Sequence, residues 1–233
     1  MLDFLFPPAC PLCQRSIRSG DSACAACRDN LLTPIDGYCQ ICSAPVGPHL
    51  LTVQGCIHCA GDRFAFERVF ALGPYEGPLR LACLRAKQDR SERIPRLLAE
   101  LLWYRRGVEI SARDYDVIVP VPEHWTTRLG RRSSPAAAIG YELGRLLKVP
   151  VDLHILRKPR RTPAQSQLSP TRRRENLKEA FCITCGVCLS GARVLLVDDV
   201  LTTGTTAQRA SRALRAAQVA SVTVAVISRG IGR

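Results

Sequence analysis

The chain has 233 residues, and 33 Lys and Arg against 20 Asp and Glu give it a formal net charge of +13 at pH 7. This length allows one medium-sized domain and a small one, and the absence of an apolar run near the ~20 residues that cross a bilayer excludes a membrane-spanning helix. The twelve cysteines stand mostly in Cys-x-x-Cys pairs without a signal peptide before them, so we expect metal-binding thiols in a soluble, cytoplasmic protein and not a secreted disulfide scaffold.

Residues 1–62 are the cysteine-rich part and are predicted to form a double zinc ribbon. Four knuckles supply eight thiolates, enough for two tetrahedral and purely structural zinc sites. The knuckles are Cys10 and Cys13, Cys24 and Cys27, Cys39 and Cys42, and Cys56 and Cys59. Sequential pairing joins the first knuckle to the second and the third to the fourth, whereas a cross-braced arrangement joins the first to the third. His58 either replaces a cysteine ligand or faces solvent.

Residues 63–233 alternate between strand and helix patterns, which predicts a second domain of the α/β class with a parallel sheet. Residues 68–72 form the first predicted strand, and the Gly- and Pro-rich segment 73–78 ends it. A helix then starts at Pro78, and residues 96–104 form another with an apolar face. Lys87 follows the first of these helices, either as a pyrophosphate contact or as a solvated helix end.

The next elements continue the same alternation. Residues 115–121 read as a buried strand, and residues 123–125 after it are expected to line a ligand crevice. Ser134 and Pro135 have the residue types of an N-cap and a first helical position, so a helix is predicted from there to Lys148. Strands are predicted at residues 151–156 and 221–227.

A strongly basic segment at residues 157–178 has no apolar periodicity. It contains Arg160, Arg161 and Arg173, and a polar loop of this length in a compact domain is usually functional or disordered. We interpret it as a mobile lid that brings cations to a departing pyrophosphate, with a disordered basic tether as the alternative. Cys182, Cys185 and Cys188 follow, either as part of a third metal site or as reduced thiols on a hairpin.

Residues 192–206, A-R-V-L-L-V-D-D-V-L-T-T-G-T-T, carry the strongest chemical signal. Residues 194–197 suit a strand buried on both faces, and two acids and a Thr/Gly cluster follow before a helix that runs toward Gln218. Backbone N–H groups and Thr hydroxyls at a helix N-terminus favour a phosphate. Asp198 and Asp199 cannot hold an anion, so we expect them to accept hydrogen bonds from ribose hydroxyls or to help hold Mg²⁺.

The pattern V-D-D-V-x-T-T-G-x-T resembles the loop that binds phosphoribosyl pyrophosphate (PRPP) in type I phosphoribosyltransferases. With the four knuckles, Y-E-G-P-L-R from Tyr75, V-P-V-P from Val119, R-T-P-A-Q-S-Q-L from Arg161 and R-R-x-N from Arg173, the whole chain resembles the ComF family of competence-associated proteins. The resemblance implies a double zinc ribbon at residues 1–62 and, at 63–233, a type I phosphoribosyltransferase-like domain with a mostly parallel sheet flanked by helices.

The same resemblance implies roles for the residues of the PRPP-like loop. Asp198, Asp199 and Thr202 are the candidate catalytic residues. The residues expected to hold the 5-phosphate are Thr202, Thr203, Gly204, Thr205 and Thr206. The implied cofactors are two structural Zn²⁺ ions and Mg²⁺ bound with PRPP. The family often has R-G-F-N-Q where this chain has Arg132, Ser133, Ser134, Pro135 and Ala136, and we expect phosphate binding to survive that change better than transfer chemistry.

Two functions from different classes follow. As an enzyme, the protein would transfer a phosphoribosyl group with pyrophosphate as leaving group, in DNA uptake and competence or in nucleotide metabolism. As a non-catalytic accessory protein, it would bind single-stranded DNA or proteins of the DNA-uptake machinery through its basic surface, with PRPP as a regulator. A third interpretation, disulfide cycling by the knuckles, conflicts with their regular metal-ligand spacing.

Overall fold

The structure, a computed structural model, describes residues 8–47, 51–52, 55–123, 133–158 and 181–231. Its centre is a four-stranded sheet of β3 (Arg68–Pro74), β4 (Val117–Pro120), β7 (Arg193–Leu201) and β8 (Ser221–Arg229). The strand order is β3-β8-β7-β4, and every pairing is parallel, as the sequence predicted. All four strands therefore end at the same edge of the sheet.

Helices cover both faces of this sheet, and the alternation of side chains along each strand shows which face each residue joins. Phe70 and Leu72 of β3 pack with helices α2 (Gly77–Ala86), α3 (Arg93–Ser111) and α4 (Pro135–Leu147) in one buried cluster. Val69 and Ala71 belong to a second cluster with α6 (Thr205–Ala216). The sheet is thus the middle layer of three, which is why its strands are apolar on both faces.

Helix α4 begins as the sequence predicted. The Ser134 side chain accepts a hydrogen bond from the Ala137 N–H at 3.1 Å, and Pro135 occupies the first turn. Further along the helix, Gly140 and Gly144 lie directly against neighbouring chain. A Cβ atom added at Gly144 would stand 2.5 Å from Val151 Cγ2 and 2.9 Å from the Val149 carbonyl oxygen. The absence of a side chain therefore lets α4 pack closely on β4 and on the segment after the helix.

Substitution Gly144→Ala is expected to lower the free energy of unfolding. Overpacking of this kind costs about 1–3 kcal/mol, and the gain in helix propensity of about 1 kcal/mol offsets only part of it. Gly47→Ala is the matched control, because a Cβ atom at Gly47 meets nothing within 4 Å. Urea denaturation of both variants measures the difference, and equal stabilities would show that α4 can move away from Val149 and Val151 at no cost.

One predicted strand is wrong. Residues 151–156 do not form a strand; Val151 makes a single parallel bridge with Ile118, and a two-residue strand β5 (Leu156–Arg157) pairs antiparallel with β6 (Cys182–Ile183). The reason is local, since the Asp152 carboxylate accepts a hydrogen bond from the His154 N–H at 2.6 Å and bends the backbone between the two ends. The helix predicted at 96–104 is also longer, from Arg93 to Ser111.

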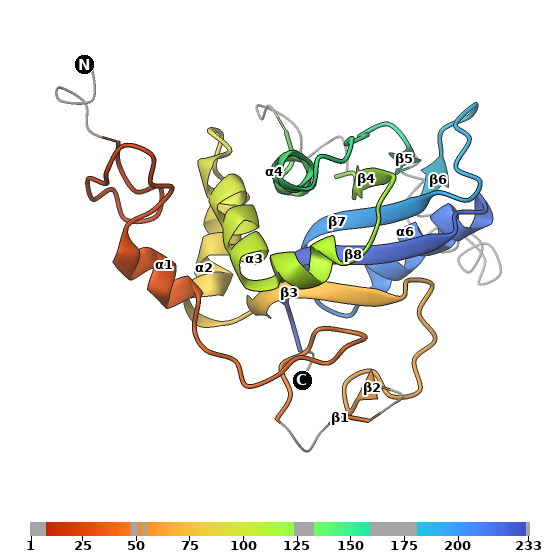
Figure 1. Ribbon diagram of the computed structural model, residues 1–233, viewed down its shortest axis with the longest axis horizontal. Coiled ribbons are helices and arrows are strands. Elements are labelled where there is room, and N and C mark those ends of the chain that lie inside the picture. The colour runs from red at the N-terminus through yellow and green to blue at the C-terminus, as the bar shows by residue number, and fades with distance from the viewer. Residues whose placement is uncertain (1–7, 48–50, 53–54, 124–132, 159–180, 232–233) are drawn as a thin grey trace, which may run out of the picture.

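The two cysteine-rich parts contact different elements of the sheet domain (Figure 1). The first, with helix α1 (Ala25–Leu31), lies beside α2, and the second, with the short strands β1 (Leu51–Thr52) and β2 (Gly55–Cys56), lies below the edge strand β3. Among the residues that the structure describes, no helix is both long enough and apolar enough to cross a membrane.

Candidate functional site

The candidate site lies where the parallel strands end. In open α/β sheets this edge carries the ligand crevice, because the loops that leave the strands converge there. The loop after β7 is residues 202–204, and α6 begins directly after it. A small cavity is lined by this loop together with Asp198, Val200 and the first residues of α6. The loop residues that the sequence singled out therefore border an open space at the end of β7.

The loop presents its polar groups outward. Thr202, Thr203, Thr205 and Thr206 are exposed, whereas Gly204 is buried and has φ of +74°, a left-handed conformation that favours glycine. The Thr203 and Thr205 hydroxyls are 2.9 Å apart. Because the first N–H groups of an α-helix have no intrahelical acceptor, the start of α6 and the Thr hydroxyls together form a donor-rich cradle suited to a phosphate.

Asp198 and Asp199 lie at the end of β7, and neither carboxylate is turned fully into solvent. The Asp198 carboxylate accepts a hydrogen bond from the Asp199 N–H at 2.9 Å, and the Asp199 carboxylate accepts one from the Val200 N–H at 2.8 Å. Burial raises the pKa of Asp198 well above its ordinary value, and the neighbouring charge of Asp199 raises it further. The two carboxyl groups are thus adjacent hydrogen-bond acceptors, and ionisation of Asp198 beside the charged Asp199 is unfavourable.

The structure brings Lys87 next to this pair of carboxylates. Its Nζ atom lies 3.1 Å from Asp199 Oδ2, although the two residues are far apart in sequence. Partial burial alone would lower the pKa of Lys87, but the ion pair with Asp199 raises it above its ordinary value. The sequence had left Lys87 as either a pyrophosphate contact or a solvated helix end, and the fold brings the end of α2 over the end of β7.

Arg229 supports the loop from below and was not singled out in the sequence. It is buried at the end of β8, and its Nη1 atom donates hydrogen bonds to the carbonyl oxygens of Leu201, Thr202 and Gly230. These bonds fix the start of the loop at residues 202–204. The sequence carries no motif around Arg229 that would have indicated this role. The role follows only from the strand order, which places the end of β8 beside the end of β7.

The cysteine sulfurs fall into two groups of four, and these are the sequential pairs and not the cross-braced ones. The groups are Cys10, Cys13, Cys24 and Cys27, and Cys39, Cys42, Cys56 and Cys59, each with all Sγ atoms within 4.8 Å of one another. Individual Sγ–Sγ distances are 3.6 Å for Cys13 and Cys24 and 3.6 Å for Cys39 and Cys59. Four thiolates about 2.3 Å from a zinc ion would stand about 3.8 Å apart, so both groups fit structural zinc.

His58 is half-buried and belongs to neither group. Cys182, Cys185 and Cys188 are exposed, and no third group that could hold a metal occurs within the described ranges. The lid residues Arg160, Arg161 and Arg173 lie outside the described residues, as do Trp125 and Arg132. Of the residues predicted to line the crevice after β4, Glu123 is described and is half-buried.

Cys42 of the second cysteine group and residues near that group lie close to the loop at residues 202–204. A cavity of about 330 Å³ lies between the two, lined on one side by Cys42, His58 and Phe64 and on the other by residues 201–204 and Arg229. A metal-binding segment from the first quarter of the chain therefore borders a loop from its last quarter.

Comparison with known families finds two matches along the chain. Residues 1–61 match the model of a double zinc ribbon domain, and residues 134–232 match that of a phosphoribosyl transferase domain. The second match includes α4, β7, the loop and α6.

Individual relatives match over most of the chain. Competence protein F of Haemophilus influenzae is 31% identical over 199 residues, which are 78% of this chain and 86% of the relative. DNA utilization protein YhgH of Escherichia coli O157:H7 is 30% identical over 207 residues, 86% of this chain and 87% of the relative. Among solved structures, the glutamine PRPP amidotransferase of B. subtilis is 26% identical over 57% of this chain and 24% of its own, with a TM-score of 0.38.

Proposed function

Since the chain belongs to the ComF family of competence-associated proteins, we propose that its sheet domain binds Mg²⁺–PRPP and transfers the phosphoribosyl group, with pyrophosphate as leaving group. The observation that carries this proposal is the arrangement around the loop after β7. A donor-rich cradle suited to a phosphate adjoins two carboxylates suited to hydroxyl donors, and a lysine lies beside them. A sugar phosphate carries both a phosphate and hydroxyl groups, so it can use both parts of the site. An inorganic anion would gain nothing from the carboxylates.

Each part has a role in this proposal. Thr202 to Thr206 hold the 5-phosphate, and Asp198 and Asp199 accept hydrogen bonds from the ribose hydroxyls. Mg²⁺ would neutralise the pyrophosphate as it leaves. Lys87 neutralises Asp199 before the ligand arrives, and its exposed ammonium group can then turn toward the pyrophosphate. The arginines Arg160, Arg161 and Arg173 are proposed to close over the same leaving group.

Wild-type protein is expected to bind Mg²⁺–PRPP in calorimetry, and Lys87→Met is expected to weaken that binding about tenfold. The reason is the loss of one charge-assisted contact worth about 1.5 kcal/mol. Arg90→Met is the matched control, because Arg90 is an exposed cation three residues away with no ion pair among the described contacts. Equal affinities of the two variants would show that Lys87 does not contact PRPP, and they would leave the proposed site at the loop after β7 unchanged.

The transfer step requires its own measurement. A pyrophosphate-release screen of the wild type with nucleobases and amines as acceptors tests it, and the family leaves the acceptor open. Binding of PRPP without pyrophosphate release would favour a regulatory PRPP site in an accessory protein. Absence of PRPP binding would overturn both versions.

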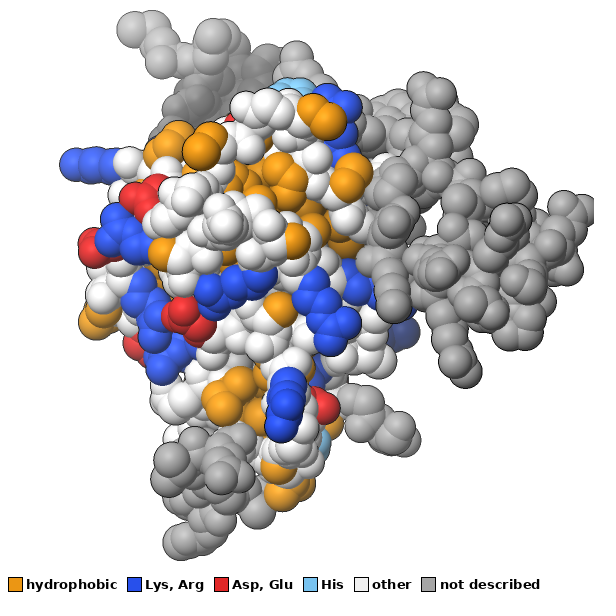
Figure 2. Space-filling view, turned by 90° about the vertical axis from the view of Figure 1, so that its right-hand side faces the viewer, with side chains coloured by type: hydrophobic (Ala, Val, Ile, Leu, Met, Phe, Trp, Pro, Cys, Tyr) orange, Lys and Arg blue, Asp and Glu red, His pale blue; other side chains and the backbone are white. Residues whose placement is uncertain are grey.

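The basic surface favours the accessory function as the second candidate. Figure 2 shows Lys and Arg side chains across the middle of one face, with acidic side chains beside those on its left and none next to those on its right. On α6, Arg209 and Arg212 face partly or fully into solvent. Such a surface would bind the phosphates of single-stranded DNA with an affinity that falls steeply as salt rises. Strong salt-dependent DNA binding by a protein that ignores PRPP would make this the primary function.

A further inference from the structure

The two cysteine groups differ in how deeply they lie in the protein. In the second group, Cys39, Cys42, Cys56 and Cys59 are all buried and pack with Ala44 and Val46. In the first group only Cys10 is buried, Cys24 and Cys27 are half-buried, and Cys13 is exposed. Solvent and small reagents can therefore reach the sulfurs of one group and not of the other.

The second group is also fixed to the sheet. The Val69 N–H donates to the Ile41 carbonyl oxygen at 2.8 Å, and the Ala71 N–H donates to Ser43 Oγ at 3.0 Å. Both acceptors stand in or beside the Cys39–Cys42 knuckle, and both donors are in β3, the edge strand. The knuckle thus takes the place of a neighbouring strand, and it cannot open without uncovering the edge of the sheet.

The first group is joined to the helices beside it by hydrogen bonds from side chains and by packing of Cys10, Ala23 and Leu31 in the cluster that includes α2 and α3. Among the described residues, no backbone-to-backbone hydrogen bond joins this group to those helices. Arg85 of α2 donates to the Leu12 carbonyl oxygen at 2.7 Å, and Arg93 of α3 donates to the Ala9 carbonyl oxygen at 2.5 Å. The side chains of Arg85 and Arg93 lie at the surface, so water can replace these bonds at little cost. The knuckle is closed by its own antiparallel bridge between Ala9 and Ser16, but within the part of the chain that the structure describes no strand pairing joins it to the sheet.

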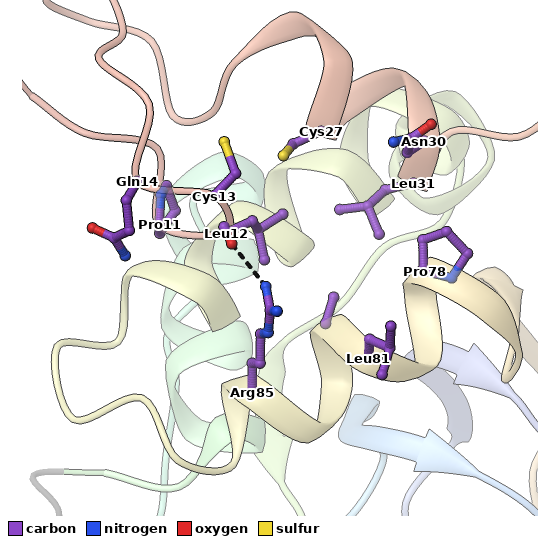
Figure 3. A pocket seen from close by; sticks show the side chains of 11 residues that line it. Pro11, Leu12, Cys13, Gln14, Cys27, Asn30, Leu31, Pro78, Leu81 and Arg85 are labelled. Atoms are coloured by element: carbon purple, nitrogen blue, oxygen red, sulfur yellow. Dashed lines mark hydrogen bonds between the residues drawn. The ribbon is translucent and has the colours of Figure 1, made fainter.

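A cavity opens beside the first group (Figure 3). Its volume is about 650 Å³, and its walls are the Cys10–Cys13 knuckle and α1 on one side and α2 on the other. Cys13 and Cys27 line it, so two of the four sulfurs can be approached from within a space large enough for a small chelating molecule.

We propose that the site of Cys10, Cys13, Cys24 and Cys27 is an exchangeable, thiol-reactive zinc site, and that the site of Cys39, Cys42, Cys56 and Cys59 holds its zinc permanently as part of the sheet. Exchange at the first site proceeds by ligand substitution. Cys13, the exposed member of the group, would be the thiolate that an incoming donor replaces on the metal, and the freed thiolate would then be available to electrophiles. The inference concerns only the ribbons, so it stands apart from the proposal that the sheet domain transfers phosphoribosyl groups.

The test follows zinc release from the full chain loaded with two zinc ions. Addition of the chromogenic chelator 4-(2-pyridylazo)resorcinol is expected to release one zinc at least about tenfold faster than the other, because the first site needs only a local opening. N-ethylmaleimide locates each step by mass spectrometry. An unlabelled portion added before the chelator blocks the exposed Cys182, Cys185 and Cys188, and an isotope-labelled portion added with the chelator then marks the newly freed thiols.

In the fast phase the labelled reagent is expected on peptides that contain Cys10, Cys13, Cys24 and Cys27. Release of both zinc ions in one phase would overturn the proposal, and so would early labelling of Cys39 or Cys42. The variant Cys13→Ser should bind one zinc and lack the fast phase. The wild-type labelling pattern decides the question without any variant, so the test stands even if Cys13→Ser does not fold.

Discussion

Replacement of both Asp198 and Asp199 by asparagine is expected to weaken Mg²⁺–PRPP binding by about 100-fold or more. Two hydrogen bonds from ribose hydroxyls to charged acceptors would become bonds to neutral amides, and bonds to charged groups contribute about 1.5–3 kcal/mol each. The side-chain oxygens of asparagine can still accept the bonds from the Asp199 and Val200 N–H groups, so the loop itself should keep its shape. Calorimetry with PRPP and Mg²⁺ measures the loss.

The single variant Asp198→Asn is expected to be more stable than the wild type at neutral pH. The folded protein raises the pKa of Asp198, through burial first and the charge of Asp199 second, so ionisation of this carboxyl opposes folding. The penalty is absent when Asp198 is protonated in both states, below the ordinary aspartate pKa of about 4. It grows as pH rises and is complete above the folded-state pKa. The stability gain of Asp198→Asn should therefore disappear in acid.

Asp114→Asn is the matched control for both measurements. Asp114 is an exposed acid that pairs with Arg193 at the opposite end of the sheet, so its replacement removes one negative charge, as Asp198→Asn does and against two in the double variant, without touching the loop. PRPP affinity should be unchanged in this variant. Equal losses in Asp114→Asn and in the double variant would mean that the carboxylate pair has no specific part in PRPP binding.

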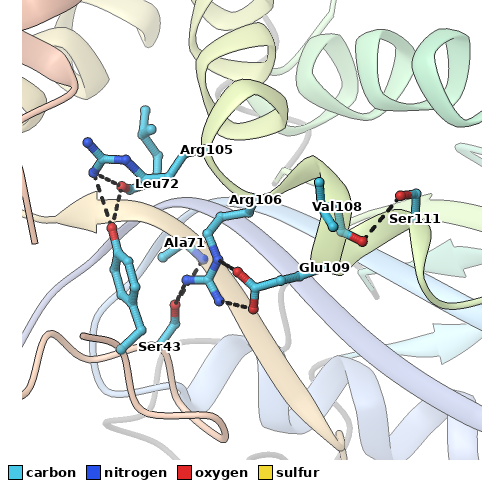
Figure 4. Close-up of polar contacts among 9 residues, drawn as sticks. Ser43, Ala71, Leu72, Arg105, Arg106, Val108, Glu109 and Ser111 are labelled. Carbon is cyan, nitrogen blue, oxygen red and sulfur yellow. Dashed lines mark hydrogen bonds and ion pairs between the residues drawn. The ribbon is translucent and has the colours of Figure 1, made fainter. Parts of the chain in front are cut away.

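Substitution Arg106→Ala is expected to lower the free energy of unfolding by about 3 kcal/mol, since the side chain is almost wholly buried and joins the second ribbon to the sheet. Its guanidinium group lies 4.4 Å from the centre of the Tyr38 ring and 5.4 Å from that of Phe70. It also bonds both carboxylate oxygens of Glu109 at 2.6 and 2.9 Å (Figure 4). The alanine variant loses the contacts of the guanidinium group with both rings, the packing of the buried aliphatic part of the side chain, and the ion pair with Glu109.

Hydrogen exchange locates the damage from Arg106→Ala. The amides of Val69 and Ala71 should exchange faster, because their acceptors Ile41 and Ser43 lie in the ribbon that Arg106 holds. Arg113→Ala is the control, since Arg113 pairs with Glu67 at the surface and such pairs contribute about 0–1 kcal/mol. A loss of stability no larger than that of Arg113→Ala would show that the ribbon holds to β3 without Arg106.

Local patterns in the sequence predicted much of the fold. The apolar runs at 68–72 and 194–197 became parallel strands of the sheet, and Ser134 and Pro135 began α4 where their residue types placed the helix. These predictions worked because hydrophobic periodicity and capping depend on neighbours a few residues apart. The strand prediction at 151–156 was wrong because the apolar pattern does not show the Asp152 side chain competing with strand pairing. Its carboxylate accepts a hydrogen bond from the His154 N–H and bends the chain.

The sequence by itself therefore determined the local chemistry of this protein: knuckles spaced for zinc, and a strand that delivers two acids and a Thr/Gly loop to one point. Only the tertiary structure decided which distant groups meet there. It paired Lys87 with Asp199, set the second ribbon against β3 and behind the loop, and left the first ribbon at the surface. The physical reason is that parallel strands must be joined by crossovers, so neighbours in the sheet are remote in sequence and no local pattern records their contact.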